Sequence, residues 1–317
     1  MHRRLQSIAF GLVVVAVVPY TVLKLMWLAG SEVGLKNAAT VAEVEGTRML
    51  VGNVVTVLLE VLAVALAFAL IRPIGRRVPG WVVLAMAGGA TGLLAPILLG
   101  LPLGMLLQLV TQGDVRTGGM DNMEPWVFGL VYGGFALLAV ALCVLLWLYV
   151  VERWGRVLAV APRTPVPWAV VAGAVGLLPF GASMLWWGFA GPGSGGPQAM
   201  DATSQRTVLV VTGVLAVAAF LVPFLASQRG SRAAWLVTWT GCAVAALQGP
   251  TQVLLANGGN PTPVMLGLAL VTTPGSCLYG WAVLRRRLAD MSGEPGEAPA
   301  SVGPGQRGRS ASSLSSR

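Results

Sequence analysis

The chain lacks the residues on which most enzymes and metal sites depend. Its 317 residues include a single histidine, His2, and only two lysines. One histidine at the start of the chain excludes histidine-based metal sites and Ser–His relays. Neither lysine belongs to a glycine-rich phosphate loop, so no nucleotide-hydrolysing motif is present. We therefore expect no enzymatic activity, no cofactor and no bound metal.

Cysteine and aspartate are also sparse where chemistry would need them. The three cysteines, Cys143, Cys242 and Cys277, fall inside apolar runs and form no CxxC pair, so we interpret them as small packing residues. No predicted span contains an aspartate, which argues against an intramembrane aspartyl protease. The segment 191–196 matches a dinucleotide fingerprint by letter, but it follows an apolar run and not a strand. We interpret it as a linker.

Long apolar runs dominate the chain instead. Hydrophobic residues make up 56% of it and charged residues 10%. A helix of about 20 apolar residues crosses about 30 Å of hydrocarbon, and these continuous runs do not alternate as barrel strands do. The sequence therefore predicts an all-α, polytopic transmembrane helical bundle of about eight spans. The predicted spans are 8–29, 51–71, 81–108, 127–150, 168–190, 207–227, 234–256 and 263–284.

Basic residues are concentrated in alternate loops. Sixteen of the 21 lysines and arginines lie before the first span, after the second, fourth and sixth, or after the eighth. Because basic residues near span ends stay in the cytoplasm, this pattern predicts a membrane protein with both termini inside. The net charge of +9 thus implies no nucleic acid. We expect membrane lipid as the main partner, with anionic headgroups favoured at the arginine-rich face.

The apolar region ends before a tail of different composition. We expect residues 1–287 to form the transmembrane domain. The segment 288–317 is rich in Ser, Gly, Pro and Arg and has few apolar groups to bury, so it is predicted to be a disordered cytoplasmic tail.

Proline and tryptophan recur at matching intervals in the two halves of the domain. The matching pairs are Pro19–Trp27 with Pro179–Trp187, and Trp81–Pro96 with Trp235–Pro250. This recurrence predicts a tandem duplication of a four-helix unit, with halves 1–160 and 161–287 related by an axis along the membrane normal. In the alternative, each proline simply kinks a helix and each tryptophan anchors at an interface.

Several polar residues lie inside the predicted spans. Lys24 and Glu60 lie about 9 Å and 14 Å below the outer ends of the first two spans, at about 1.5 Å per residue. Charges within lipid normally pair or face water, so a Lys24–Glu60 ion pair is the simplest arrangement. Other polar residues flank the prolines of the last two spans: Gln248, Thr251, Gln252, Thr272 and Thr273.

Two functions remain open from these residues, and a third, an intramembrane enzyme, is the weakest because it would rest on Glu60 as its sole acid or base. In the first, the protein is a structural, binding or partner-associated membrane component, whose polar groups hold helices together or satisfy proline-freed carbonyls. In the second, it is a small-solute transporter or channel with an outward-facing polar cavity around Lys24 and Glu60. The sequence identifies neither a solute nor a protein partner.

The segment 19–27, Pro-Tyr-Thr-Val-Leu-Lys-Leu-Met-Trp, is the most distinctive of the chain. Together with Trp-Val-Val-Leu at 81–84 and the Ala/Val/Leu/Gly bias, it resembles multi-pass integral membrane proteins of actinobacteria that carry no assigned activity. The resemblance implies residence in the plasma membrane and supplies no catalytic residue.

Overall fold

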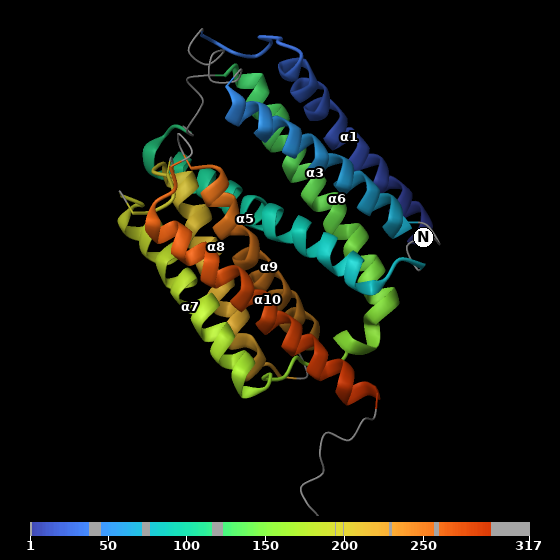
Figure 1. Cartoon of the computed structure of the whole chain (residues 1–317). Coiled ribbons are helices and arrows are strands. Elements are labelled where there is room, and N and C mark those ends of the chain that lie inside the picture. Colours follow the sequence, from blue (N-terminus) through green and yellow to red (C-terminus); the bar gives the residue numbers. More distant parts are fainter. Residues whose placement is uncertain are drawn as a thin grey trace, which may run out of the picture.

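The computed structural model describes residues 2–37, 46–71, 77–115, 123–193, 195–198, 200–227, 230–256 and 260–292. Every named element in these ranges is a helix, and each predicted span coincides with one, so the all-α prediction is confirmed (Figure 1). The helices are α1 (His2–Leu28), α3 (Thr47–Ile71), α5 (Gly80–Gln112), α6 (Pro125–Leu158), α7 (Pro167–Ala190), α8 (Thr203–Leu225), α9 (Ser231–Leu254) and α10 (Pro263–Ser292).

Seven of the described helices are long and apolar enough to cross a membrane. The other, α9, has 24 residues and a length of about 36 Å at 1.5 Å per residue. Polar residues dilute its apolar character, but Thr238, Thr240 and Gln248 are buried within the protein. Because α9 packs against α5, α8 and α10, it needs less lipid-compatible surface than the others. The molecule is a helical bundle of about eight spans.

The helices form two groups. In the first, α1, α3 and α6 enclose a core that includes Val13, Leu66 and Leu142. In the second, α7, α8, α9 and α10 form a ring around a core that includes Phe180 and Tyr279. Helix α5 runs obliquely between the groups and packs chiefly against α8 and α9 (Figure 1). It therefore joins the two groups.

Glycines allow α5 to approach its neighbours at backbone distance. The contacts pair Gly92 with Ala243, Gly100 with Val208 and Gly104 with Ser204. A Cβ atom at Gly104 would lie 2.6 Å from the carbonyl oxygen of Ser204 and 2.7 Å from its Cα. Such small-residue contacts drive helix association in lipid, because apolar side chains gain little free energy by moving from lipid into a helix interface. Despite two internal prolines, α5 is a continuous helix of 33 residues.

Exposed tryptophans mark where α7 leaves the hydrocarbon. Trp168 is 56% exposed and Trp186 is 69% exposed, near opposite ends of the helix. They are eighteen residues apart in sequence, or about 27 Å at 1.5 Å per residue. This separation is close to the ~30 Å of a hydrocarbon core, and tryptophan favours the interface on either side of it.

The start of α1 and the end of α10 lie at the same end of the bundle (Figure 1). This arrangement is the one that an even number of spans requires. Helix α10 continues to Ser292, so residues 288–292, which composition assigned to the disordered tail, are helical because they extend the last span. The remainder of the predicted tail lies outside the described residues.

Replacing Gly104 with alanine should lower the melting temperature of the purified chain in detergent micelles. Alanine gains about 1 kcal/mol in helix propensity, but overpacking against the Ser204 backbone costs about 1–3 kcal/mol. Gly89→Ala, on the same helix, is the matched control, since a Cβ atom at Gly89 would meet nothing within 4 Å. It should melt at or above the temperature of the parent. Equal melting temperatures for the two variants would contradict the close packing of α5 on α8.

Candidate functional site

Helices α1 and α3 lie side by side and carry the two charged residues predicted within the spans. Lys24 is 8% exposed and Glu60 is 4% exposed. The Lys24 ammonium donates a hydrogen bond to Oδ1 of Asn53, at 2.7 Å, and the Thr21 hydroxyl donates to Oε2 of Glu60. Among the contacts of these described residues there is no direct ion pair between Lys24 and Glu60. Each charged group instead bonds a neutral partner on the facing helix.

Aromatic rings surround the lysine ammonium. Its nitrogen lies 5.0 Å from the ring centroids of both Tyr20 and Trp27. Cations are attracted to the faces of such rings, and the attraction is stronger where water is excluded. The indole of Trp27, one turn closer to the end of α1, also donates a hydrogen bond to the Val33 carbonyl at 2.9 Å. Trp27 therefore covers Lys24 on the side where α1 ends.

The loop after α1 closes this end of the first helix group. The backbone N–H of Glu124 donates to the Gly34 carbonyl at 2.9 Å, and Leu35 pairs with Met123 in an isolated antiparallel bridge. Gly34 has φ +81°, and a Cβ atom there would collide with Val127. The same valine packs with Leu23 and Trp27 in a small apolar cluster. Apolar side chains thus cover Lys24 at this end of the first helix group.

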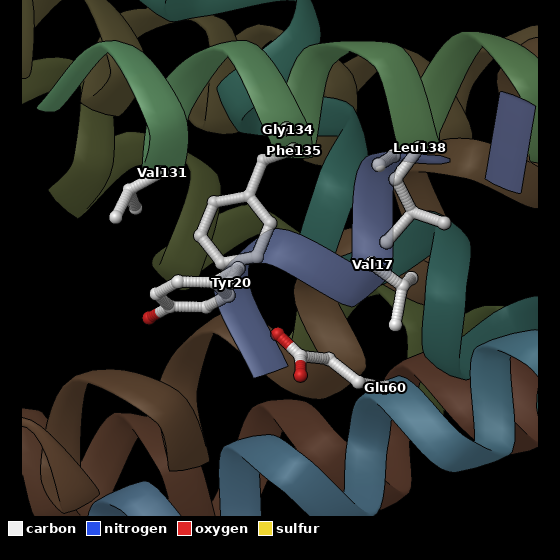
Figure 2. A pocket seen from close by; sticks show the side chains of 8 residues that line it. Val17, Tyr20, Glu60, Val131, Gly134, Phe135 and Leu138 are labelled. Atoms are coloured by element: carbon white, nitrogen blue, oxygen red, sulfur yellow. The ribbon is translucent and has the colours of Figure 1, made fainter. Parts of the chain in front are cut away.

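One oxygen of the Glu60 carboxyl group has no hydrogen-bond partner. This oxygen, Oε1, is buried, and the Glu60 side chain lines a narrow hollow between α1, α3 and α6, which the rings of Tyr20 and Phe135 border (Figure 2). The rings meet edge to face, with centroids 5.2 Å apart, and the hollow holds no volume for a water-sized molecule. An unpartnered buried oxygen costs free energy, so its presence calls for a physical reason.

Gln248 of α9 satisfies a backbone carbonyl on α5. Its amide nitrogen donates to the Gly92 carbonyl at 2.9 Å. In an uninterrupted helix that carbonyl would accept the N–H of residue 96, but residue 96 is Pro96, which has none. The glutamine therefore supplies the hydrogen bond that proline removes. We call this arrangement a proline clip.

A second proline clip joins α10 to α9. The Thr273 hydroxyl donates to the Ala246 carbonyl at 2.8 Å, four residues before Pro250. The other predicted residues behave differently. Thr251 donates to the Leu247 carbonyl of its own helix at 2.7 Å, Thr272 is buried, and Gln252 is half-buried. Two of the five polar residues predicted on α9 and α10 thus bridge helices at proline-freed carbonyls.

The structure does not bring the seven predicted residues together. Lys24 and Glu60 lie in the first helix group, whereas the glutamines and threonines belong to the second, so the described residues form no single cavity lined by all seven. Sequence reasoning missed Asn53 and Thr21, the hydrogen-bond partners of the two charges. Asn53 had a signal, because it is the only side-chain amide in the predicted span 51–71.

Comparisons with protein-family models, with curated proteins and with solved structures found no match. No group of His, Cys, Asp and Glu that could hold a metal ion occurs in the part of the chain that the structure describes. The fold itself defines the class of the molecule. It is a multi-span helical membrane protein.

Gln248→Met should destabilise the chain by about 1–3 kcal/mol, because it leaves the Gly92 carbonyl buried without a donor. The measurement is thermal unfolding in detergent micelles. Gln252→Met, four residues away on the same helix, is the control and should change the melting temperature little. In a Pro96→Ala background the Gly92 carbonyl regains a backbone donor, so the Gln248→Met loss should largely disappear. Additive losses in the double variant would contradict the proline clip.

Proposed function

We propose that the chain is a structural or binding component of the plasma membrane, and neither an open conduit nor an enzyme. The proline clips carry this proposal. Gln248 and Thr273, which could have lined a solute path, are instead engaged at the backbones of neighbouring helices. Polar side chains used in this way fix helix positions, which is what a membrane scaffold or binding protein requires.

The closure of the first helix group also supports the proposal. Trp27 lies over the lysine ammonium, and the hollow beside Glu60 has no volume for water. A solute entering from the end of α1 would have to displace the apolar cluster of Leu23, Trp27 and Val127. The partner that we propose is a component of the membrane itself, a lipid or another membrane protein.

The proposed orientation places both termini in the cytoplasm, because the basic residues gather in the loops at that end. A phosphatase that is active only outside the cytoplasm should be inactive when fused before Met1 or after Arg317. The same phosphatase inserted after Gly193, in the loop between α7 and α8, should be active. Activity of either terminal fusion, with an inactive insertion at Gly193, would reverse the orientation.

A second candidate function is a carrier for a proton or small solute through the first helix group. The unpartnered Oε1 of Glu60 specifically favours it, since a buried acceptor on a side chain that lines a hollow is suited to bind a proton or donor. Lys24 lies on the adjacent helix, within electrostatic range of Glu60. A movement of α6 away from α1 would enlarge the hollow and expose the carboxyl group.

A double-mutant cycle separates the two functions. If the charges are structural, Lys24→Met should cost about 1–3 kcal/mol because Asn53 loses its donor, and Glu60→Gln should also destabilise the chain because Lys24 loses the opposite charge within electrostatic range. Since the two groups form no direct ion pair, the double variant should recover only part of the summed loss, as melting temperatures in detergent would record.

The same variants are then reconstituted into liposomes that carry a pH gradient. Under the scaffold proposal, the gradient decays at the same rate with the parent, with Glu60→Gln and with Glu32→Gln, an exposed loop control. Decay that the parent accelerates and Glu60→Gln abolishes, without a loss of melting temperature, would establish the carrier instead.

A further inference from the structure

A hollow of about 320 Å³ lies at the end of the second helix group, where α7 begins. It is bounded by the segment 161–164 between α6 and α7, by the end of α8 and by α10. Arg163, Thr164 and Arg286 supply its polar groups, and Pro223 and Ala226 form part of its apolar wall. Its volume falls within the range of about 300–1,000 Å³ that is typical of ligand sites.

The charge of this hollow suits an anion. Both charged side chains that line it are arginines, and none of its described lining residues is acidic. One N–H of the Arg286 guanidinium donates to the Thr164 carbonyl, which fixes the side chain across the hollow. The Arg286 guanidinium has five N–H donors, so most of them remain available to a ligand. The fork of donors fits two oxygens of a phosphate group.

The depth of the hollow suits a lipid more than a soluble anion. Trp168, exposed in the first turn of α7, and Trp281, exposed one turn before Arg285, mark the membrane interface beside it. Leu225, which is 78% exposed, is the last residue of α8 and directly precedes Ala226. A phosphate in the hollow would therefore lie at the level of headgroups, and its acyl chains would extend along the exposed apolar face of α8.

We propose that this hollow binds the phosphate headgroup of an anionic phospholipid through Arg163 and Arg286. The inference does not depend on whether the first helix group is a scaffold or a carrier, because it concerns the second group. Inorganic phosphate shares the relevant chemistry, so the experiment must separate the two sources.

The experiment is native mass spectrometry of the full chain in detergent, titrated with phosphatidylglycerol, with phosphatidylcholine as the neutral lipid. Arg163→Gln and Arg286→Gln should each weaken retention of phosphatidylglycerol about tenfold, the loss expected for one charge-assisted hydrogen-bond partner. Arg285→Gln removes the same charge from an exposed neighbour that does not line the hollow, and should change retention less than about twofold. Unchanged melting temperatures establish that the variants are folded.

Three outcomes would overturn the proposal. An equal loss in Arg285→Gln would indicate diffuse electrostatic attraction and no defined site. Equal retention of phosphatidylcholine would exclude recognition of the anionic headgroup. Retention of inorganic phosphate but not of phosphatidylglycerol, lost in Arg286→Gln, would assign the same chemistry to a soluble anion and overturn the lipid assignment.

Discussion

A backbone carbonyl that loses its helical partner inside lipid is costly unless another donor reaches it, and two such carbonyls tie α9 to α5 and to α10. Pro96 frees the Gly92 carbonyl, and Gln248 reaches it from α9. Gln248 lies two residues before Pro250. The same stretch of α9 therefore donates to α5 through Gln248 and accepts from Thr273 of α10 at the Ala246 carbonyl. The absence of a side chain at Gly92 also allows α9 to approach that carbonyl. Proline, glycine and amide thus act as one device linking three helices.

In the first helix group, one buried position carries a charge where its counterpart in the second group is apolar. Corresponding positions in α1 and α7 are buried in both groups: Tyr20 with Phe180, Lys24 with Met184, and Trp27 with Trp187. Such correspondence is what a duplicated four-helix unit predicts, and the duplication itself stays a prediction. The chemistry differs, because methionine fills its position by packing alone, whereas the lysine ammonium needs Asn53 and two rings.

Length and hydropathy predicted the helices well, because crossing a bilayer imposes a minimum length that composition records directly. The partners of individual side chains could not be predicted in the same way. The depth of Lys24 and Glu60 followed from residue counts, but their contacts depend on how each helix is rotated about its axis. The helices against which α5 packs could not be predicted either. Its glycines favour a close neighbour, yet the sequence does not state that this neighbour is α8, three helices later in the chain.

The polar character of α9 has a consequence for how the protein is made. Thr238, Thr240 and Gln248 are compatible with the membrane interior only while α5, α8 and α10 surround them. As an isolated segment leaving the ribosome, α9 would partition into lipid less readily than its neighbours, because each polar group would meet hydrocarbon. We therefore expect its insertion to depend on α5 and α8, which are synthesised earlier, so that the second helix group begins to assemble before α10 has been translated.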